Sequence, residues 1–440
     1  MKTYSILLLT LAIMVLTGCS SDDDAKTLTL SSETLVLGTD ITEQTISVKS
    51  DASWNVRSNV QWCKPIKNNG KGNDDIVLWV SPNLTQTPRQ GTLTVSTGNL
   101  TRTVKLSQPA YTGSLDDYVY RLPVMFHVLY NDKEDEQQYV KEGHLAKILT
   151  GVNKLYDSNH MNVEFEMARY DDKGNLLDEP GVMRHEVSFT DYLPEDFLKS
   201  DNQDNRQYAD YAQNLRRYIN IYIFQFKEES KEHVTMGLSN LPVMPTAHPL
   251  DSLYTTDQAN GYSYLTAPWG CLINNQYIYE WQEANTYNPN YIVNTVAHEL
   301  GHYLGLLHTF SAEECEMDDA CDDTHISDYT NYVSYISEYI KQQTALGIKI
   351  FKMADLAVRK DCKTLEEYQA HNIMDYAYCF NDEFSHQQFL RTRQVLQYSP
   401  LVPGPKLVEY TITRSANIAP LRAKTSGCPT TLRHFPVSPI

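Results

Sequence analysis

Short runs in which apolar and polar residues alternate fill residues 27–110 of the chain. A period of two residues is typical of strands with one buried face, and turn residues separate these runs at the spacing of an all-β domain. The pattern predicts a β-sandwich of about 80 residues, with Trp54 and Trp62 in its core or at the core's edge. The runs are TLTL, QTISV, SWNVRS, DIVLWVSP, GTLTVS and TRTVKLSQ.

After a polar linker at residues 111–117, strand-like and helix-like patterns are mixed. Residues 121–130 are an apolar run typical of a buried strand, and apolar residues then recur at helical spacing from His144 to Tyr156. Four more strand-like segments precede a helix with apolar residues between positions 292 and 307. This mixture predicts an α+β domain over residues 113–400. The four segments are residues 161–171, 218–226, 236–242 and 271–275.

The last of these helices carries His298, Glu299, His302, Gly305 and His308 in the spacing HExxHxxGxxH. His298 and His302 lie about one helical turn apart, so both imidazoles face the same side and can hold one metal ion. Gly305 lacks a Cβ and can turn left-handed, which ends the helix and brings His308 to the same ion. Three neutral nitrogen ligands with an open fourth position predict one catalytic Zn²⁺. Glu299 is then placed to take a proton from the zinc-bound water.

The competing interpretation is that these histidines are ordinary helix residues. It fits poorly, because the apolar residues around them mark one buried face of an amphipathic helix. With this ligand set complete, His127, His185 and His233 are predicted to be structural or exposed.

The first nineteen residues carry one lysine and then an apolar run from Ile6 to Leu16. The run is shorter than the roughly 20 residues that a bilayer span needs, so it predicts an export signal. It ends in LTGC, which resembles a bacterial lipobox, and residues 20–24 resemble the acidic export tag of Bacteroidetes surface lipoproteins. The resemblance implies lipidation of Cys19, an acidic tether over residues 20–26, and an exported lipoprotein exposed on the outer membrane. An ordinary secretory signal is the alternative.

The remaining cysteines are disulfide candidates in an exported protein. Two bridges are expected among Cys315, Cys321, Cys362 and Cys379, with three connectivities open. Cys63, next to a tryptophan of the predicted sandwich, is expected to pack there and not to cap the zinc as a latency thiol. The formal net charge of −18 argues against a nucleic-acid partner, which favours a basic face.

Two family resemblances cover most of the chain. The order SWNV, W, PRQGTLTV and VKLSQPA resembles the BACON domain, an immunoglobulin-like module, which implies a spacer or a carbohydrate- or mucin-binding module. Residues 121–398 resemble the pappalysin family of metzincin metallopeptidases. The motifs are PVMFHVLY, VNKLY, NVEFEMARYDDKGN, GVMR, NIYIF, GLSNLP, HELGHYLGLLHTF, DDT and NIMDY.

The pappalysin resemblance implies a metzincin-type catalytic domain, with a twisted mixed sheet, an active-site helix and a lower subdomain. It also implies that Met374 forms the methionine turn beneath the metal and that Tyr376 stabilises the oxyanion; the alternative for Tyr376 is simple packing. The domain departs from the family in a predicted helix at residues 327–346, which covers the cleft, binds a partner or packs on the surface.

An acidic run follows the metal motif. Asp318, Asp319, Asp322 and Asp323 are candidate ligands for Ca²⁺, which takes several carboxylate and carbonyl oxygens, although the run lacks EF-hand spacing and a solvated loop is the alternative. The tail at residues 401–440 either wraps the lower subdomain or is partly disordered.

These observations predict a surface-anchored zinc endopeptidase that acts on proteins or peptides. An edge strand near residues 272–274 is expected to align the extended substrate. The competing class is an adhesin or glycan-binding lipoprotein built on a degenerate peptidase scaffold; the intact ligands and Glu299 argue against degeneracy.

Overall fold

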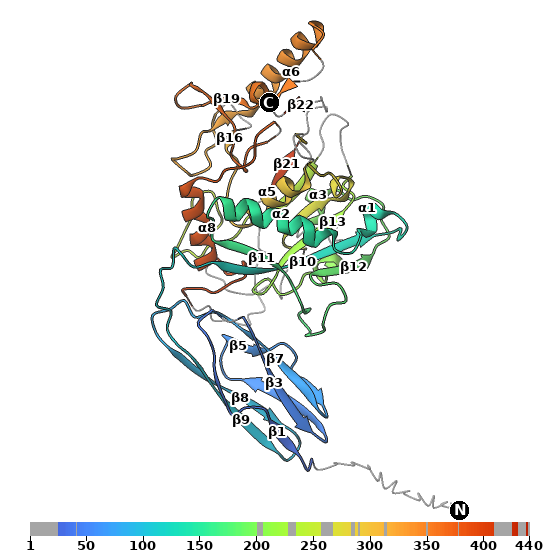
Figure 1. Ribbon diagram of the computed structural model, residues 1–440, viewed down its shortest axis with the longest axis vertical. Helices are drawn as coiled ribbons and strands as arrows, with labels where there is room; N and C mark the ends of the chain where they lie inside the picture. The colour runs from blue at the N-terminus through green and yellow to red at the C-terminus, as the bar shows by residue number, and fades with distance from the viewer. Residues whose placement is uncertain are drawn as a thin grey trace, which may run out of the picture. The chain divides into compact units, whose positions relative to one another are not determined.

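The computed structural model describes residues 25–40, 42–199, 206–227, 235–256, 267–282, 287–288, 291–311, 315–348, 351–376, 378–408, 425–429 and 437–438. The chain forms two compact units (Figure 1). The second comprises Gly38–Thr42, Ser81–Arg89 and everything from Gln108 onward. Cys19 and His233 lie outside the described residues. Within those residues, no helix has the length and apolar character needed to cross a membrane.

The first unit is built from two sheets. Burial alternates along their strands, as the sequence pattern predicts, and Trp54 and Trp62 are both buried. A Cβ on Gly70 would lie 2.1 Å from the Trp54 ring, so only glycine lets the neighbouring strand approach this side chain. One sheet has the order β1 (Leu28–Leu30), β3 (Glu43–Ser50), β7 (Asp74–Val80), β5 (Cys63–Pro65). The other has the order β2 (Thr34–Val36), β9 (Thr101–Gln108), β8 (Arg89–Ser96), β4 (Ser53–Ser58), β6 (Asn69–Lys71).

The second unit is organised around a mixed sheet of seven strands. Its order is β11 (Val163–Met167), β10 (Tyr120–Tyr130), β13 (Ile219–Phe224), β15 (Cys271–Asn274), β14 (Thr235–Asn240), β21 (Thr425–Pro429), and β12 (Val182–Glu186) also pairs with β10. The neighbouring strands β11, β10, β13 and β15 are parallel to one another. By contrast, β14 is antiparallel to β15, and β21 is antiparallel to β14. Every residue of β13 is buried, because both faces of a parallel sheet are covered.

Helices α2 (His144–Ser158) and α5 (Ile292–Tyr303) cover one face of this sheet. The two helices approach closely, since a Cβ on Gly151 would lie 2.8 Å from Val293. Ile221 and Ile223 of β13 join this core, whereas Tyr222 and Phe224 point to the opposite face and pack with Phe197. The shorter elements of this half are α1 (Glu136–Tyr139), α3 (Pro194–Phe197), α4 (Arg206–Ala209) and η3 (Asn275–Tyr277).

The residues after α5, apart from those of β21, form the lower half of the second unit. The predicted inserted helix is present as α6 (Tyr329–Ala345), capped by Asp328. A further helix, α8 (His386–Tyr398), begins with a capping box at Ser385. The remaining elements are β16 (Phe310–Ser311), β17 (Ser327–Asp328), β18 (Phe351–Lys352), α7 (Met353–Leu356), β19 (Val358–Lys360), β20 (Glu367–Gln369) and β22 (Val437–Ser438). β22 pairs with β18.

Two predictions are corrected by the structure. The segment near residues 272–274 is not an edge strand, because β15 pairs with β13 on one side and β14 on the other. One disulfide forms in place of the expected two, between Cys315 and Cys362. Cys321 and Cys379 remain buried free thiols. The thiol of Cys379 donates to the carbonyl oxygens of Ala370 and Asn372 within its own loop, which gives it partners without a second bridge.

Asp361, beside the disulfide, anchors a turn. Its carboxylate accepts hydrogen bonds from the backbone N–H groups of Lys363 (2.8 Å) and Thr364 (2.7 Å) and from the ring of His325 (3.0 Å). Burial acts to raise the pKa of Asp361, but the hydrogen bonds from Thr364, His325 and Lys363 outweigh it and lower the pKa to about 2. The carboxylate therefore stabilises the fold at neutral pH.

Replacement Asp361→Ala is expected to lower the free energy of unfolding at pH 7 by about 1–3 kcal/mol, because two backbone N–H groups lose their acceptor. A folded-state pKa near 2 lies below the unfolded value near 4, so the stabilisation is complete above pH 4 and is lost as the pH falls toward 2. Urea unfolding of both proteins between pH 7 and about pH 2 measures the difference. A gap that stays constant down to pH 3 and below would contradict this assignment.

Candidate metal centre

Three histidines converge at the end of α5. His298 and His302 come from the helix and His308 from the turn after it, and their ligand nitrogens all lie within 4.8 Å of one another. The Nε2 atoms of His302 and His308 are 2.9 Å apart. The residues present thus fit one small cation held by three imidazoles.

Backbone carbonyls orient two of these rings. Nδ1 of His298 donates to the carbonyl oxygen of Ile373 and Nδ1 of His302 to that of Leu306, both at 2.8 Å. A carbonyl oxygen can only accept, so Nε2 of each ring is left with its lone pair for a metal. Nε2 of His298 is buried with no partner among the described residues, and burial lowers the pKa of His298 to about 4. A neutral buried imidazole with an unpaired nitrogen is suited to ligate an ion.

Gly305 makes the turn that brings the third histidine back, as predicted. Its φ is +94°, and the turn is closed by hydrogen bonds from Leu306 N to Gly301 O and from Gly305 N to His302 O, both 2.9 Å. This pair of bonds is a Schellman motif, which requires a left-handed residue at its centre. A Cβ on Gly305 would also meet Val395 at 2.6 Å. The left-handed φ and the contact with Val395 both disfavour any residue other than glycine at position 305.

Glu299 is fully buried, and neither carboxylate oxygen has a hydrogen-bond partner among the described residues. Burial raises its pKa well above the usual value for a carboxyl group. A cation bound by the adjacent histidines would favour the charged form again. The group is thus a buried acid–base group poised beside a metal site.

Strand β14 lies directly against Glu299. A Cβ on Gly237 would lie 2.5 Å from Oε1 of Glu299, so this strand passes within contact distance of the carboxylate only because the residue is glycine. The sequence analysis did not single out Gly237. A glycine within a strand pattern is a signal for such a close approach.

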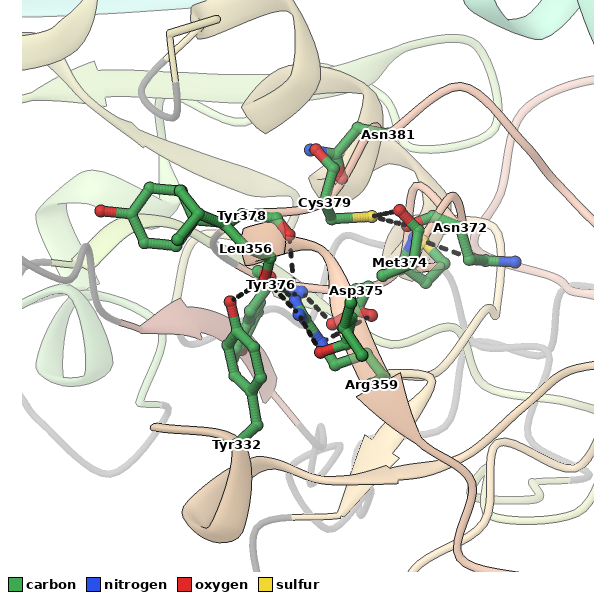
Figure 2. Close-up of polar contacts among 12 residues, drawn as sticks. Tyr332, Leu356, Arg359, Asn372, Met374, Asp375, Tyr376, Tyr378, Cys379 and Asn381 are labelled. Carbon is green, nitrogen blue, oxygen red and sulfur yellow. Dashed lines mark hydrogen bonds and ion pairs between the residues drawn. The ribbon is translucent and has the colours of Figure 1, made fainter. Parts of the chain in front are cut away.

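The loop predicted to form the methionine turn, with Met374 and its neighbours (Figure 2), packs against the helix that carries His298 and His302. Met374 is fully buried, and a Cβ on Gly301 of α5 would lie 2.5 Å from its sulfur atom. The side chain of Asn372 accepts a hydrogen bond from Met374 N at 2.9 Å and is itself held by Gln388 of α8. The loop also carries Ile373, whose carbonyl orients His298. A change in the conformation of this loop would therefore change the orientation of the His298 ring.

A buried arginine holds the other side of this loop (Figure 2). Nε of Arg359 lies 3.5 Å from Oδ2 of Asp375, and its NH2 group donates to the carbonyl oxygens of Tyr376 (2.9 Å) and Tyr378 (3.3 Å). The guanidinium also stacks 3.4 Å above the ring of Tyr332 in α6. Sequence analysis missed Arg359, because it lies in the inserted segment and its partner is distant in the sequence.

Tyr376 lies next to the metal ligands. Its buried ring is 4.5 Å from the ring of His308 and 4.1 Å from that of Phe310, measured between centroids. The residue expected from the family resemblance to act on the oxyanion is thus in the site.

The four aspartates proposed for calcium do not converge on one point. Asp318 pairs with Lys363 at 2.9 Å, and the buried Asp319 accepts hydrogen bonds from Thr324. Asp323 caps the start of α8, where it accepts from Ser385 at 2.6 Å, and Asp322 is exposed. Three of the four carboxylates serve separate protein contacts, so the structure gives this calcium site no support.

Other candidate ligands have structural roles. His127 is buried, and its ring nitrogens are hydrogen-bonded to Nε2 of His185 (3.1 Å) and Oδ1 of Asn220 (2.9 Å). Both ring nitrogens of His127 therefore have protein partners. His371, Asp382 and Glu383 form a second group with metal-ligand spacing, but its residues are partly or largely exposed. His371 and Asp382 already bond to each other at 2.8 Å.

Comparison with protein families yields two matches. Residues 202–397 match a peptidase family described as "Pregnancy-associated plasma protein-A", the family of the pappalysins. Residues 52–109 match BACON, described as "Putative binding domain, N-terminal". The first match contains the three histidines, Glu299 and Met374. Both resemblances drawn from the sequence are thereby confirmed. No curated protein matches the chain.

Comparison with solved structures adds little. A Bacteroides ovatus xyloglucanase in complex with a heptasaccharide is 14% identical, with a TM-score of 0.19 over 46% of this chain and 56% of that one. A protein from Bacteroides thetaiotaomicron is 16% identical, with a TM-score of 0.16 over 21% of this chain and 97% of that one. This chain therefore spans about half the length of the xyloglucanase. Scores this low bear on neither fold nor function.

Proposed function

Since the chain carries a pappalysin-type metallopeptidase domain after a BACON domain, we propose that it is a zinc-dependent endopeptidase with Glu299 as its general base. The observation that carries the proposal is the convergence of three histidine ligand nitrogens beside a buried carboxylate that has no partner among the described residues. A purely structural role would leave Glu299 buried with no compensating interaction, which is costly for a carboxyl group.

The proposed mechanism assigns a task to each residue. Zinc bound by His298, His302 and His308 would supply a Lewis acid and lower the pKa of a water molecule. Glu299 takes the proton of the attacking water on a carboxylate oxygen and delivers it to the departing amine nitrogen. Tyr376 donates a hydrogen bond to the oxygen of the scissile carbonyl as negative charge develops there. Ile373 and Leu306 keep the ligand rings in one orientation through their carbonyl oxygens.

The decisive experiment is a zinc count. One zinc ion per chain is expected for the parent, and His302→Ala should reduce zinc content to less than about one tenth, because two nitrogen ligands rarely retain the ion. His386→Ala, which removes an exposed histidine, should leave the zinc content unchanged. Elemental analysis after gel filtration measures both. A parent without zinc, or a His302→Ala protein that is folded and fully loaded, would refute the proposal.

Gly237→Ala tests the contact between β14 and Glu299. The added methyl group must displace the carboxylate, and a displacement of the order of 1 Å can cost about 10²-fold in rate. We expect kcat/KM for a library-derived peptide to fall at least about tenfold with zinc content retained. Gly98→Ala is the matched control, since nothing lies within 4 Å of its Cβ position. Equal rates for parent and Gly237→Ala would show that Glu299 does not need its present position.

The anchoring and the role of the sandwich belong to the same proposal. Lipidation of Cys19 would tether the protein to the outer membrane, facing outward. The negative net charge gives no reason to expect a nucleic-acid partner. The sandwich would act as a spacer or contact carbohydrate or mucin, in line with the description of the BACON family as a binding domain. Because every proposed catalytic group lies in the second unit, the sandwich is not expected to take part in the chemistry.

A further inference from the structure

The C-terminal segment of the chain completes the sheet of the second unit. β21 pairs antiparallel with β14, with Thr425 opposite Asn240, Ser426 opposite Ser239, Gly427 opposite Leu238 and Cys428 opposite Gly237. Figure 1 shows β21 in red beside α5, although the first strand of that sheet, β10, already ends at Tyr130. Without β21, β14 would be an edge strand with free backbone N–H and C=O groups.

The edge that β21 covers is the one next to the metal centre. A Cβ on Gly237 of β14 would lie 2.5 Å from Oε1 of Glu299, and Cys428 is the partner of Gly237 across the ladder. An extended peptide paired with β14 would therefore run past the general base at this register. The backbone of residues 425–429 already follows that course.

The tail is also fixed in the lower half of the unit. β22 pairs in parallel with β18, with Val437 opposite Phe351. Phe351 packs in a cluster with Tyr332 and Tyr378, which surround the arginine that holds the methionine loop. The tail thus pairs with the seven-stranded sheet through β21 and with the lower half of the unit through β22.

We propose that residues 425–429 are an intramolecular competitor of an extended peptide substrate, because they occupy the outer edge of β14. This proposal rests on the proposed endopeptidase function. A tethered segment has an effective concentration in the millimolar range, so even a weak strand pairing keeps the edge occupied. Substrate then binds only to the fraction of molecules whose tail has left β14.

This competition predicts a particular kinetic signature. Raising the free fraction of β14 lowers the apparent KM by the same factor and leaves kcat at saturating substrate unchanged. A merely structural role of the tail would make weaker pairing reduce kcat or stability instead. A lower apparent KM at unchanged kcat therefore indicates that the tail is an inhibitor, whereas a lower kcat indicates a purely structural role.

The test uses the full chain with single substitutions in β21. Alternate residues of an antiparallel strand donate their N–H to the partner strand, so one of Ser426→Pro and Gly427→Pro removes a hydrogen bond to β14. That variant should cleave a library-derived peptide with an apparent KM at least about tenfold below the parent's, at equal kcat. Ser426→Ala keeps its N–H and should behave like the parent. A synthetic peptide with the sequence of residues 423–431, added to the proline variant, should compete with substrate.

A second measurement does not depend on activity. Hydrogen exchange at residues 235–240 should be faster in the effective proline variant than in the parent, and the synthetic peptide should restore protection. If the zinc-loaded parent and both proline variants cleave with the same KM and exchange alike, the proposal is overturned while the endopeptidase function stands. If none of the proteins cleaves any peptide, the endopeptidase function falls and the inhibitor proposal falls with it. Exchange that is unchanged by the prolines would in either case refute the pairing.

Discussion

Glu299→Gln should retain zinc and fold but lose peptide cleavage by about 10² to 10⁴ in kcat, the usual contribution of a positioned general base. The amide has nearly the same shape as the carboxylate, so it fits the buried position against β14, but it cannot accept the water proton. Zinc content, thermal unfolding and turnover of a library-derived peptide are the measurements.

The stability of this variant is informative in its own right. Burial raises the pKa of Glu299, because the ionised carboxylate is costly to bury. The amide of Glu299→Gln does not ionise. The metal-free variant should therefore unfold at the same or a higher temperature than the metal-free parent. Glu142→Gln, which changes an exposed carboxylate, is the matched control and should leave both turnover and stability unchanged. Cleavage by Glu299→Gln at the parent's rate would rule out the mechanism proposed for this site.

The parts of the site that could be predicted from sequence are those fixed by local backbone geometry. His298 and His302 share a face because helices repeat every 3.6 residues, and Gly305 was recognisable as a turn because few residues tolerate its φ of +94°. The main strands of the domain and the helices α2 and α5 followed from apolar periodicity, which also depends only on local backbone geometry. Distant contacts did not contribute to any of these inferences.

The spatial order of the strands was beyond such reasoning. Residues 236–242 precede residues 271–275 in the chain, and both patterns are typical of short apolar strands, so neither pattern indicated that β14 lies farther from the centre of the sheet than β15. The structure places β15 inside because it continues the parallel part of the sheet next to β13. The pairing of β21 with β14 was hidden as well, since the tail carries no clear strand periodicity.

The support of the metal centre was the other part that sequence could not reveal. Asp375 was seen in the NIMDY motif, but its partner Arg359 lies in an insertion with no motif of its own. The same holds for Cys379, whose thiol has two carbonyl partners that a count of cysteines cannot anticipate. The partner of Arg359 is set by tertiary packing and the partners of Cys379 by the conformation of its own loop, and spacing along the chain predicts neither.

Arg359→Ala should therefore be the most destabilising single change in the lower half. The side chains of Arg359 and Asp375 are only 1% and 2% exposed, so removing the arginine leaves a buried carboxylate without its counter-ion. Breaking a buried pair in this way costs about 3–5 kcal/mol. The carbonyl oxygens of Tyr376 and Tyr378 lose their donor at the same time. Lys360→Ala, which removes the exposed neighbouring cation, is the matched control.

The same substitution should reach the metal. The loop held by Arg359 carries the Ile373 carbonyl that fixes the ring of His298, so zinc should bind at least about tenfold more weakly, the usual cost of losing support behind a ligand. Asp375→Asn, which keeps the shape but removes the buried negative charge, should restore part of the stability when combined with Arg359→Met. Urea unfolding of the metal-free proteins and zinc titration of the folded ones separate the two effects. If Arg359→Ala matches Lys360→Ala in both measurements, the pair does not hold the methionine loop; if stability falls while zinc affinity is unchanged, the loop and the metal ligands are not coupled.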